Sequence, residues 1–484
     1  MNLLERIDRW ASLAPQKVAH VSGERTLSYE ELRARSDALA GYLAEQFGDD
    51  HAPVAVLGHR EPEMLIAFLG AVKSGRPYVP IDTALPQQRI DTILAISRPT
   101  VVLRAEETVR LSAGGGTASA RAMQSDDPFY ILFTSGSTGE PKGVVITLSC
   151  LEHFVGWMLS EQKFTGAETF LNQAPFSFDL SVMDLYCSLS TGGTLFSISR
   201  DLVENPKLLY RALGRSKITT WVSTPSFAQM CLVEATFGEA MLPHARRFLF
   251  CGETLAWQTA ARLRERFPRA EIWNMYGPTE ATVATTSVLI NDEVLHQYSP
   301  LPVGRPMPGT QLAIVDQAGK PVSPGERGEI LIAGPNVSPG YLARPDLTAE
   351  VFCQYDGRRA YRTGDRGYFR DDLLFFEGRM DAQIKLSGYR IELGDIEANL
   401  LSLRRVREAV VLPMMKDGVA QSLAAFVVLN RPGGGSAFEL SHALRTELGQ
   451  RLPAYMLPRK FVFLDALPLT PNAKVDRAKL ASSL

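Results

Sequence analysis

Cysteine and histidine are scarce in this chain. Its 484 residues include five cysteines and seven histidines. The cysteines are odd in number and widely spaced along the sequence: Cys150, Cys187, Cys231, Cys251 and Cys353. Their spacing matches neither a zinc-ligand motif nor a disulfide framework. Because the histidines are scattered as well, the sequence predicts neither a zinc site nor a disulfide-rich fold.

Strong charge and long apolar runs are also missing. A formal net charge of −2 provides no basic field for nucleic acid. No uninterrupted apolar run approaches the length of a membrane span, and the N-terminus MNLLERIDRW carries charges too early for a signal peptide. We therefore expect a soluble cytoplasmic protein. A hydrophobic content of 45% can fill large cores, and the length exceeds one compact domain.

The most informative segment spans residues 129–145 and reads FYILFTSGSTGEPKGVV. An apolar run, Phe129–Phe133, predicts a buried strand, and a loop of small, hydroxyl and glycine residues follows it. Small residues let the backbone approach a ligand, and hydroxyls, exposed N–H groups and a lysine suit phosphate oxygens. The segment predicts a polyphosphate-binding loop rather than an ordinary polar hairpin. It is not a Walker A loop, because Pro141 precedes Lys142 and Gly143 follows it.

Strand and helix patterns alternate up to about residue 300. Ser28 and Glu31 fit a capping box that starts a helix. Predicted strands and helices follow at Val54–Leu57, 62–74, Tyr78–Ile81, Ile218–Val222 and Phe248–Phe250. This alternation favours parallel sheets covered by helices, which bind ligands at the carboxyl ends of the strands. Residues 310–335 switch to short β segments, and Ser112–Ala122 and Arg431–Ala437 read as surface loops.

The pattern restarts after about Gly378. We predict helices near Leu393–Leu403 and Glu439–Arg451, with strands near Ala409–Leu412, Leu423–Leu429 and Phe461–Leu464. These are enough for a small separate α/β domain. The polar junction Gly378–Asp381 is the candidate hinge. The prediction is an N-terminal domain of residues 1–380 and a C-terminal domain of residues 381–484.

Three further motifs carry side chains suited to a nucleotide or an amino acid. In Asn274–Glu280, Tyr276 offers a face for a base to stack on, and Glu280 is an oxygen ligand suited to Mg²⁺. Tyr361–Asp365 predicts a turn whose carboxylate can bind ribose hydroxyls. Asp179 lies among apolar neighbours, so it either caps a helix or meets a cation such as a substrate ammonium, and from the residues alone the cap is favoured.

These motifs occur in the order seen in the adenylate-forming superfamily, and the chain resembles that superfamily over essentially its whole length. The matching segments are Thr26–Leu32, Tyr78–Asp82, Thr134–Gly143, Phe178–Ser181, Asn274–Glu280, Gly340–Leu342, Tyr361–Asp365, Gly378–Glu397, Leu452–Pro458 and Asn472–Arg477. Within the superfamily the chain is most similar to amino acid adenylation domains, and among these to stand-alone D-alanine–D-alanyl carrier protein ligases. The segments Leu171–Tyr186, Ser223–Leu232 and Phe248–Glu253 carry this closer resemblance.

The resemblance implies an α/β fold with a large N-terminal domain, which includes a small β subdomain, and a smaller mobile C-terminal domain. It implies ATP and Mg²⁺, with Glu280 holding the metal ion. The ATP phosphates would meet Thr134, Ser135, Gly136, Ser137, Thr138, Gly139 and Lys142. Adenine and ribose would meet Asn274, Tyr276, Gly277, Thr279, Asp365 and Arg379. The amino acid would meet Asp179, Cys251 and Gly252. Asp381 would be the hinge and Lys474 the catalytic lysine.

The expected reaction activates D-alanine as D-alanyl-AMP and passes it to the phosphopantetheine thiol of a carrier protein, for D-alanylation of cell-wall or envelope polymers. Because the chain ends shortly after Lys474, we expect the carrier to be a separate protein. The alternatives are a ligase for another small amino acid, such as L-proline or L-alanine, and a non-catalytic nucleotide-binding protein. Ala473, Ser387 and Gly394-Asp395 depart from the pattern of the D-alanyl ligases.

Overall fold

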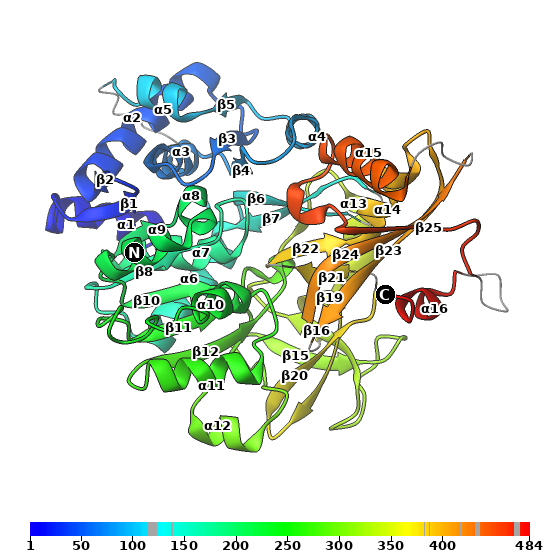
Figure 1. Ribbon diagram of the computed structural model, residues 1–484. Coiled ribbons are helices and arrows are strands. Elements are labelled where there is room, and N and C mark those ends of the chain that lie inside the picture. The colour runs from blue at the N-terminus through cyan, green and yellow to red at the C-terminus, as the bar shows by residue number, and fades with distance from the viewer. Residues whose placement is uncertain are drawn as a thin grey trace. The chain divides into compact units, whose positions relative to one another are not determined.

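The structure is a computed structural model that describes residues 1–114, 123–136, 139–381, 383–386, 388–416, 419–430, 436–468 and 475–484. The chain divides into two compact units (Figure 1). The first comprises Met1–Thr83, Ser97–Leu132 and Gly143–Met380. The second comprises Ala84–Ile96, Phe133–Lys142 and Asp381–Leu484.

One sheet of the first unit has the strand order β14-β13-β12-β11-β10-β8-β9-β1-β2. From β12 to β1 neighbouring strands are parallel, and at both edges they are antiparallel. The strand bounds are β1 Val18–Ser22, β2 Arg25–Ser28, β8 Thr169–Asn172, β9 Thr194–Ser197, β10 Thr220–Ser223, β11 Arg247–Phe250, β12 Glu271–Tyr276, β13 Thr286–Leu289 and β14 Arg305–Pro306.

A second sheet has the order β17-β7-β6-β4-β3-β5, in which β4, β3 and β5 are parallel. Its strands are β3 Val54–Gly58, β4 Tyr78–Asp82, β5 Val101–Leu103, β6 Pro128–Thr134, β7 Lys142–Thr147 and β17 Gly340–Tyr341. A third, antiparallel sheet has the order β15-β16-β19-β18, with β20 paired to β19. Its strands are β15 Gln311–Val315, β16 Gly328–Ala333, β18 Phe352–Tyr355, β19 Arg358–Arg370 and β20 Leu373–Arg379.

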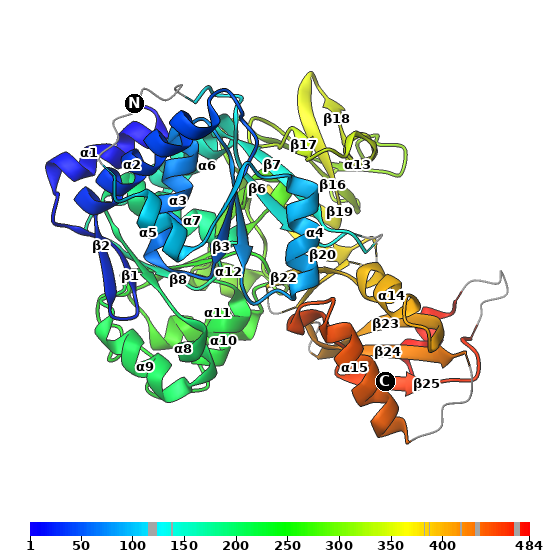
Figure 2. The same ribbon diagram turned by 90° about the horizontal axis from the view of Figure 1, so that it is seen from above.

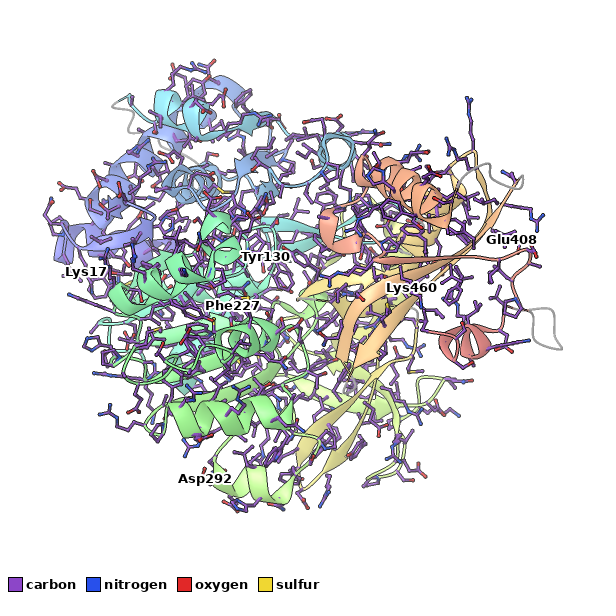
Figure 3. The ribbon with its side chains drawn as sticks, in the orientation of Figure 1. Lys17, Tyr130, Phe227, Asp292, Glu408 and Lys460 are labelled. Atoms are coloured by element: carbon purple, nitrogen blue, oxygen red, sulfur yellow. The ribbon has the colours of Figure 1, made fainter. Side chains whose placement is uncertain are left out.

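Helices of the first unit cover these parallel sheets. Helices α2, α3 and α5 pack against one another, and α3 packs on β3 and β4 (Figure 2). The helix bounds are α1 Leu3–Leu13, α2 Tyr29–Phe47, α3 Pro62–Lys73, α5 Ala105–Leu111, α6 Leu148–Gln162, α7 Leu180–Thr191, α8 Arg200–Glu204, α9 Pro206–Arg215, α10 Pro225–Cys231, α11 Trp257–Arg266, α12 Asp292–Gln297 and α13 Pro345–Val351. In Figure 3, Tyr130 lies in the interior of this unit and Asp292 on its outside.

The second unit contains the hairpin β21-β22 and a sheet in the order β23-β24-β25. Its elements are α4 Gln87–Ser97, β21 Gln383–Leu386, β22 Tyr389–Glu392, α14 Leu393–Leu401, β23 Val406–Lys416, β24 Val419–Leu429, α15 Ala437–Gly449, β25 Lys460–Phe463 and α16 Arg477–Ala481. A core of its own joins α14, α15 and one face of this sheet, with Ile396, Val411, Val427 and Leu448 among its buried residues.

The predicted α/β class is confirmed. The capping box at Ser28 and Glu31 is present and starts α2. One predicted turn is wrong: Tyr361–Asp365 lies inside β19. Gly364 in this segment has φ +67°, and the pairing of β19 with both neighbouring strands shifts register close to it. The glycine that suggested a turn therefore marks an irregularity within a long strand.

The expected loops fall partly outside the described residues. Of Ser112–Ala122, residues 115–122 lie outside, as do residues 431–435 of Arg431–Ala437. Ser436 is the N-cap of α15, so the end of the second segment begins a helix instead of a loop. All five cysteines are described and none forms a disulfide. No helix in the described part of the chain is long and apolar enough to cross a membrane.

Candidate active site

A buried carboxylate, Asp365 of β19, joins two other predicted site residues. The Tyr276 hydroxyl donates a hydrogen bond to Asp365 Oδ2 at 2.6 Å, and Arg379 Nη1 donates to Asp365 Oδ1 at 2.7 Å. Burial, and then the nearby carboxylate, raise the pKa of Tyr276 well above its usual value, so the hydroxyl keeps its proton and donates. Strand pairing explains the contact between Asp365 and Arg379, because the two residues lie opposite each other on β19 and β20.

The backbone around Asp365 is held from both sides. Thr363 Oγ1 donates to the Ile330 carbonyl at 2.6 Å and accepts from the Asp365 N–H at 3.0 Å. Arg379 Nη1 also donates to the Thr363 carbonyl at 2.6 Å. Each oxygen of an ionised carboxylate has two lone pairs. Asp365 therefore keeps the capacity to accept hydrogen bonds from a ligand's hydroxyls while Tyr276 and Arg379 hold it in place.

The turn after β12 carries the next predicted residues. Gly277 has no room for a side chain, because a Cβ there would lie 2.6 Å from the Ala284 Cα. This close backbone approach is the reason for glycine in the motif. The turn then forms a short 3₁₀ helix, Thr279–Ala281. Glu280 within it is fully buried, and the Tyr341 hydroxyl donates to its Oε1 at 2.7 Å. Tyr341 is a partner that the motif did not indicate.

Asp179 occupies the N-cap position of α7, as the residue pattern alone favoured, but its side chain makes no capping hydrogen bond. The prediction that the Asp179 side chain caps the helix is therefore wrong. The Thr279 hydroxyl instead donates to Asp179 Oδ2 at 2.6 Å. Asp179 and Thr279 are a hundred residues apart in the chain, and this contact joins the loop after β8 to the turn after β12. The Asp179 carboxylate is buried.

Cys251 and Gly252 directly follow β11. Cys251 is buried, and its Sγ lies 3.5 Å from the Val283 carbonyl oxygen. Gly252 has φ +91°, which L side chains rarely adopt, and a Cβ there would contact Phe178 and Thr224 at 3.5 and 3.7 Å. Phe178 is the neighbour of Asp179. The loops after β8, β10 and β11 therefore meet at these residues, at the carboxyl ends of parallel strands.

The sequence did not point to Thr282 and Val283. Both are β-branched and both have positive φ, +57° and +68°. Such residues adopt this region only when their surroundings force it, and strain of this kind clusters at functional sites. Thr282 Oγ1 donates to the Asn336 carbonyl at 2.8 Å, which helps hold the turn. Composition gives no signal for this strain, since Thr and Val ordinarily favour strands.

Asn274, predicted to contact the nucleotide, is buried within β12. Its Nδ2 donates to the Pro302 carbonyl at 2.8 Å. The amide therefore fixes the segment after α12 beside β12.

The predicted phosphate loop belongs to the second unit. Gly136 has no room for a side chain, because a Cβ would lie 2.1 Å from the Glu140 carbonyl oxygen. The Thr134 hydroxyl is buried without a hydrogen-bond partner in the described part of the protein. Ser135 Oγ donates to the Arg390 carbonyl at 2.8 Å and accepts from the Glu392 N–H at 3.1 Å. Lys142 Nζ lies 4.0 Å from Glu392 Oε1.

Three predicted residues, Ser137, Thr138 and Lys474, lie outside the described residues. Asp381, the predicted hinge, begins the last segment of the second unit, and its Oδ1 accepts from the Gln383 N–H at 3.0 Å.

The carboxylate of Glu280 is the predicted protein ligand of a magnesium ion. In the described part of the chain, no group of three or more acidic, histidine or cysteine residues is placed to hold a metal. Mg²⁺ commonly uses one or two protein carboxylates together with substrate phosphate oxygens and water. Glu280, buried and oriented by Tyr341, fits Mg²⁺ in that shared form, in which ATP phosphates would supply other ligands.

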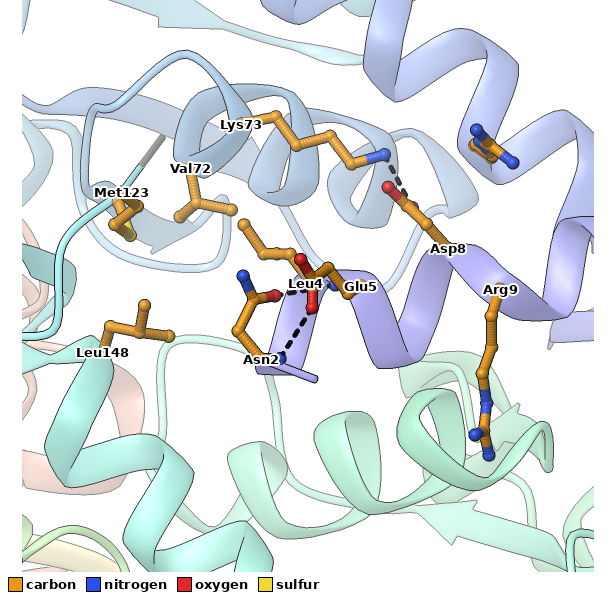
Figure 4. A pocket seen from close by; sticks show the side chains of 10 residues that line it. Asn2, Leu4, Glu5, Asp8, Arg9, Val72, Lys73, Met123 and Leu148 are labelled. Atoms are coloured by element: carbon orange, nitrogen blue, oxygen red, sulfur yellow. Dashed lines mark hydrogen bonds and ion pairs between the residues drawn. The ribbon is translucent and has the colours of Figure 1, made fainter. Parts of the chain in front are cut away.

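A cavity of about 440 Å³ in the first unit lies away from these residues (Figure 4). It is lined by α1, α3 and their neighbours. Among its polar groups, Lys73 Nζ contacts Asp8 and Asp37 at 2.8 and 2.6 Å, and Asn2 and Glu5 form the capping box of α1. These four acidic, basic and amide side chains and that of Asp37 are therefore paired with one another.

Comparison with known protein families identifies the class. The model of the AMP-binding enzyme family matches residues 7–342, and that of the AMP-binding enzyme C-terminal domain matches residues 395–474. The chain therefore belongs to the AMP-binding enzymes, and the predicted adenylate-forming fold is confirmed.

Individual curated proteins and solved structures are also similar to this chain. The chain is 46% identical to the D-alanine–D-alanyl carrier protein ligases of Bacillus mycoides (strain KBAB4) and Bacillus cereus (strain B4264), over 100% of both chains. Among solved structures, it resembles holo-PA1221, an NRPS protein containing adenylation and PCP domains (TM-score 0.84, 26% identity, 100% of this chain and 84% of that chain). The Vibrio cholerae adenylation domain AlmE, in complex with glycyl-adenosine-5'-phosphate, shares the fold (TM-score 0.86, 23% identity, 99% and 98%).

Proposed function

We propose that this enzyme activates D-alanine with ATP and transfers the D-alanyl group to the phosphopantetheine thiol of a separate carrier protein, supplying D-alanine for cell-wall or envelope polymers. The observation that carries the proposal is full-length identity of 46% to ligases that bear this name. The buried pairs Tyr276–Asp365 and Thr279–Asp179 support it with side chains of suitable chemistry. We place the reaction in the cytoplasm.

The proposed nucleotide site uses the residues around Asp365. Tyr276 stacks on adenine, while Asp365 accepts hydrogen bonds from the ribose hydroxyls and Arg379 lies near ribose and phosphate. Asn274, Gly277 and Thr279 form the part of the nucleotide site that holds adenine. The loop Thr134–Gly139 and Lys142 hold the ATP phosphates, because backbone N–H groups, hydroxyls and a lysine suit phosphate oxygens.

The proposed amino acid site centres on Asp179, whose carboxylate accepts the substrate α-ammonium. Thr279 holds one carboxylate oxygen in place, so less ordering is needed when the ammonium binds. Cys251 and Gly252 border the methyl group of the substrate. Asp179 and Cys251 are buried, and Gly252 has no side chain, which suits a substrate with a small side chain.

In the first half-reaction, a substrate carboxylate oxygen attacks the α-phosphorus of ATP, and the bond from that phosphorus to the bridging oxygen breaks. D-alanyl-AMP and pyrophosphate result. Negative charge develops on the transferring group and on pyrophosphate, and Lys474 and the phosphate loop stabilise it. Glu280 would hold Mg²⁺, which would supply further charge neutralisation.

In the second half-reaction, the carrier thiol gives up its proton and its sulfur attacks the acyl carbon. A thioester forms, and the carbon–oxygen bond to AMP breaks. We propose that Asp381 is the hinge through which the C-terminal domain, residues 381–484, changes position between the two steps, so that Lys474 leaves and the thiol enters.

Pyrophosphate exchange tests the first half-reaction. The purified protein is incubated with ATP, Mg²⁺, labelled pyrophosphate and one amino acid at a time. We expect label in ATP only with a small amino acid, and most with D-alanine. Stronger exchange with L-proline or L-alanine would favour the alternative ligase, and no exchange with any amino acid would favour a nucleotide-binding protein. Release of ADP would contradict adenylation altogether.

A further inference from the structure

A buried arginine of the first unit contacts the start of the loop that leads to Asp179, without belonging to any motif of the candidate site. Arg60 follows β3 and precedes α3, and only 6% of it is exposed. Its Nη2 donates to the Gln173 carbonyl, its Nε donates to the Ala174 carbonyl at 3.4 Å, and its Nη1 donates to the Ile198 carbonyl. Arg60 thus joins the backbone of two loops, which follow β8 and β9.

Burying this guanidinium is costly unless its N–H groups find partners. The planar fork of arginine can reach several carbonyl oxygens at once, which the single ammonium of lysine cannot do in the same geometry. His59 Nε2 lies 2.8 Å from Arg60 Nη1, and His59 Nδ1 lies 2.8 Å from Asp82 Oδ2. Arg60 is therefore itself oriented by His59, which Asp82 holds in place. The arrangement keeps the guanidinium rigid.

The clamped loop is the one that bears Asp179. Residues 173–179 connect β8 to α7, and the carbonyls of the first two of them accept from Arg60. The Ala174 carbonyl also accepts from Asn172 Nδ2 at 3.1 Å. Five residues further along the loop, Asp179 accepts from Thr279. The loop is therefore fixed at its start by Arg60 and Asn172 and at its end by Thr279.

A buried network continues this support beneath the loop. Asn172 Nδ2 also donates to Asp184 Oδ1 of α7 at 3.1 Å, and Ser197 Oγ donates to Asn172 Oδ1 at 2.7 Å. Since the Ser197 proton is used in that bond, its oxygen accepts from His20 Nε2 at 2.8 Å, and the His20 proton lies on Nε2. Burial lowers the pKa of His20 to about 3, so the ring is neutral. The network holds β8, β9 and α7 together.

We propose that Arg60 is a positioning residue of the amino acid site: by clamping the start of the β8–α7 loop it sets the place of Asp179, and so the affinity for the α-ammonium of the substrate. The inference rests on the ammonium role of Asp179 proposed above. Errors of about 1 Å in the placement of a binding group can cost up to about a hundredfold in rate. Loss of the clamp should therefore weaken binding of the amino acid and leave binding of ATP intact.

The test compares Michaelis constants in pyrophosphate exchange. In Arg60→Met, which keeps an unbranched side chain but no donor, KM for D-alanine should rise about tenfold or more while KM for ATP changes less than about twofold. Arg60→Lys keeps a charge but not the fork and should recover only part of the loss. If Arg60→Met fails to fold, the same KM comparison is made with Arg60→Lys alone.

Arg76 provides a matched control. It is also fully buried in the first unit and also donates to backbone carbonyls, those of Ser74 and Gly48 at 3.0 and 2.8 Å, beyond the far end of α3. Arg76→Met should lower the melting temperature as Arg60→Met does, yet change neither KM. A role of Arg60 in stability alone predicts the same kinetics for both variants.

A double variant tests the route through Asp179. Asp179→Asn should raise KM for D-alanine, and adding Arg60→Met should raise it little further, because the clamped group is already impaired. An unchanged KM for D-alanine in both Arg60 variants, equal increases in both KM values, or fully additive effects in the double variant would overturn the inference. Failure of the proposed function would appear differently, as no D-alanine-dependent exchange in the parent protein.

Discussion

At the scale of single residues, hydrogen bonds from neighbouring hydroxyls fix the orientation of the acidic side chains in the candidate site. Asp365 and Asp179 each accept from a hydroxyl, that of Tyr276 and that of Thr279, at 2.6 Å. The two hydroxyls come from one seven-residue motif, Asn274–Glu280, in which Tyr276 ends β12 and Thr279 lies in the turn that follows. This single motif therefore orients the carboxylates that we assign to ribose and to the amino acid.

Removing the Tyr276 hydroxyl should weaken ATP binding. Tyr276→Phe keeps the ring that we propose stacks on adenine but takes one donor from Asp365, and a hydrogen bond to a charged group is worth about 1.5–3 kcal/mol. We expect KM for ATP to rise about tenfold, with KM for D-alanine unchanged. Tyr298→Phe is the control, because the Tyr298 hydroxyl also donates to an aspartate, Asp371, at 2.9 Å, and this pair is not among the candidate site residues. Equal effects of both variants would contradict the role of Tyr276.

Cys251 should govern the choice between alanine enantiomers. With the ammonium on Asp179 and the carboxylate near phosphate, the methyl group points in one of two directions. If the Cys251 sulfur fills the direction taken by L-alanine, Cys251→Ala should raise kcat/KM for L-alanine relative to D-alanine by about 10–200-fold. Cys231, a buried cysteine in a different apolar cluster, is the control. An unchanged ratio in Cys251→Ala would leave the cysteine as a packing residue.

Sequence patterns singled out candidate acidic residues but not the side chains that contact them. Asp179 was recognisable because a carboxylate among apolar residues is costly, but Thr279 as its partner was not, since a hundred residues separate them. Arg60 gave no signal either, because its contacts with the two loops are made to backbone carbonyls, which every residue possesses. Long-range partners of this kind depend on the sheet order, which local patterns do not contain.

At the scale of elements, apolar runs with clear boundary signals were predicted well. The run at residues 54–57 is β3, and the predicted strand Phe248–Phe250 lies within β11. The prediction was wrong for residues 361–365, where a glycine and polar residues suggested a turn. Those residues lie within β19, whose pairing with β16, β18 and β20 continues on both sides of the irregularity at Gly364. Tertiary pairing overrode the local signal.

A buried ion pair joins two helices of the second unit and should make its stability depend on pH. Arg89 Nη2 of α4 donates to Asp395 Oδ2 of α14 at 3.2 Å, and Asp395 is fully buried. Burial raises the pKa of Asp395 from its usual 3.8 to about 6, although Arg89 acts in the opposite direction. A raised carboxyl pKa means that its contribution to stability is fully present below pH 3.8 and is lost as the pH rises through about 6.

Replacing this carboxylate should therefore help at neutral pH. Asp395→Asn keeps the shape but carries no charge, so the cost of ionising a buried carboxyl, on the order of 3 kcal/mol for a shift of about two units, disappears. We expect its melting temperature, relative to the parent, to improve as the pH rises from 5 to 8. Asp91→Asn, an exposed position on α4, controls for the change in net charge. A variant that is less stable than the parent at pH 8 would show that the ion pair stabilises the unit.

At the scale of the whole molecule, the compact units do not follow the order of the chain. The second unit combines Ala84–Ile96 and Phe133–Lys142 with the last hundred or so residues. Local patterns predicted a restart of the α/β pattern after Gly378, but no local pattern indicates that two earlier segments pack with it. The predicted boundary after residue 380 and the hinge at Asp381 stay predictions.

The proposed domain movement makes the two half-reactions separable by mutation. Lys474 is expected to stabilise charge only while pyrophosphate leaves, so Lys474→Ala should slow D-alanyl-AMP formation by about 10²–10³-fold. Transfer from synthetic D-alanyl-AMP to the carrier thiol should proceed at nearly the parent rate, because the lysine has left the site by then. Rapid-quench measurements of the two steps separately provide the check, with Lys479→Ala on α16 as the control. Equal loss in both steps would mean that Lys474 acts throughout the cycle or supports the fold, and a single catalytic arrangement would then have to account for both reactions.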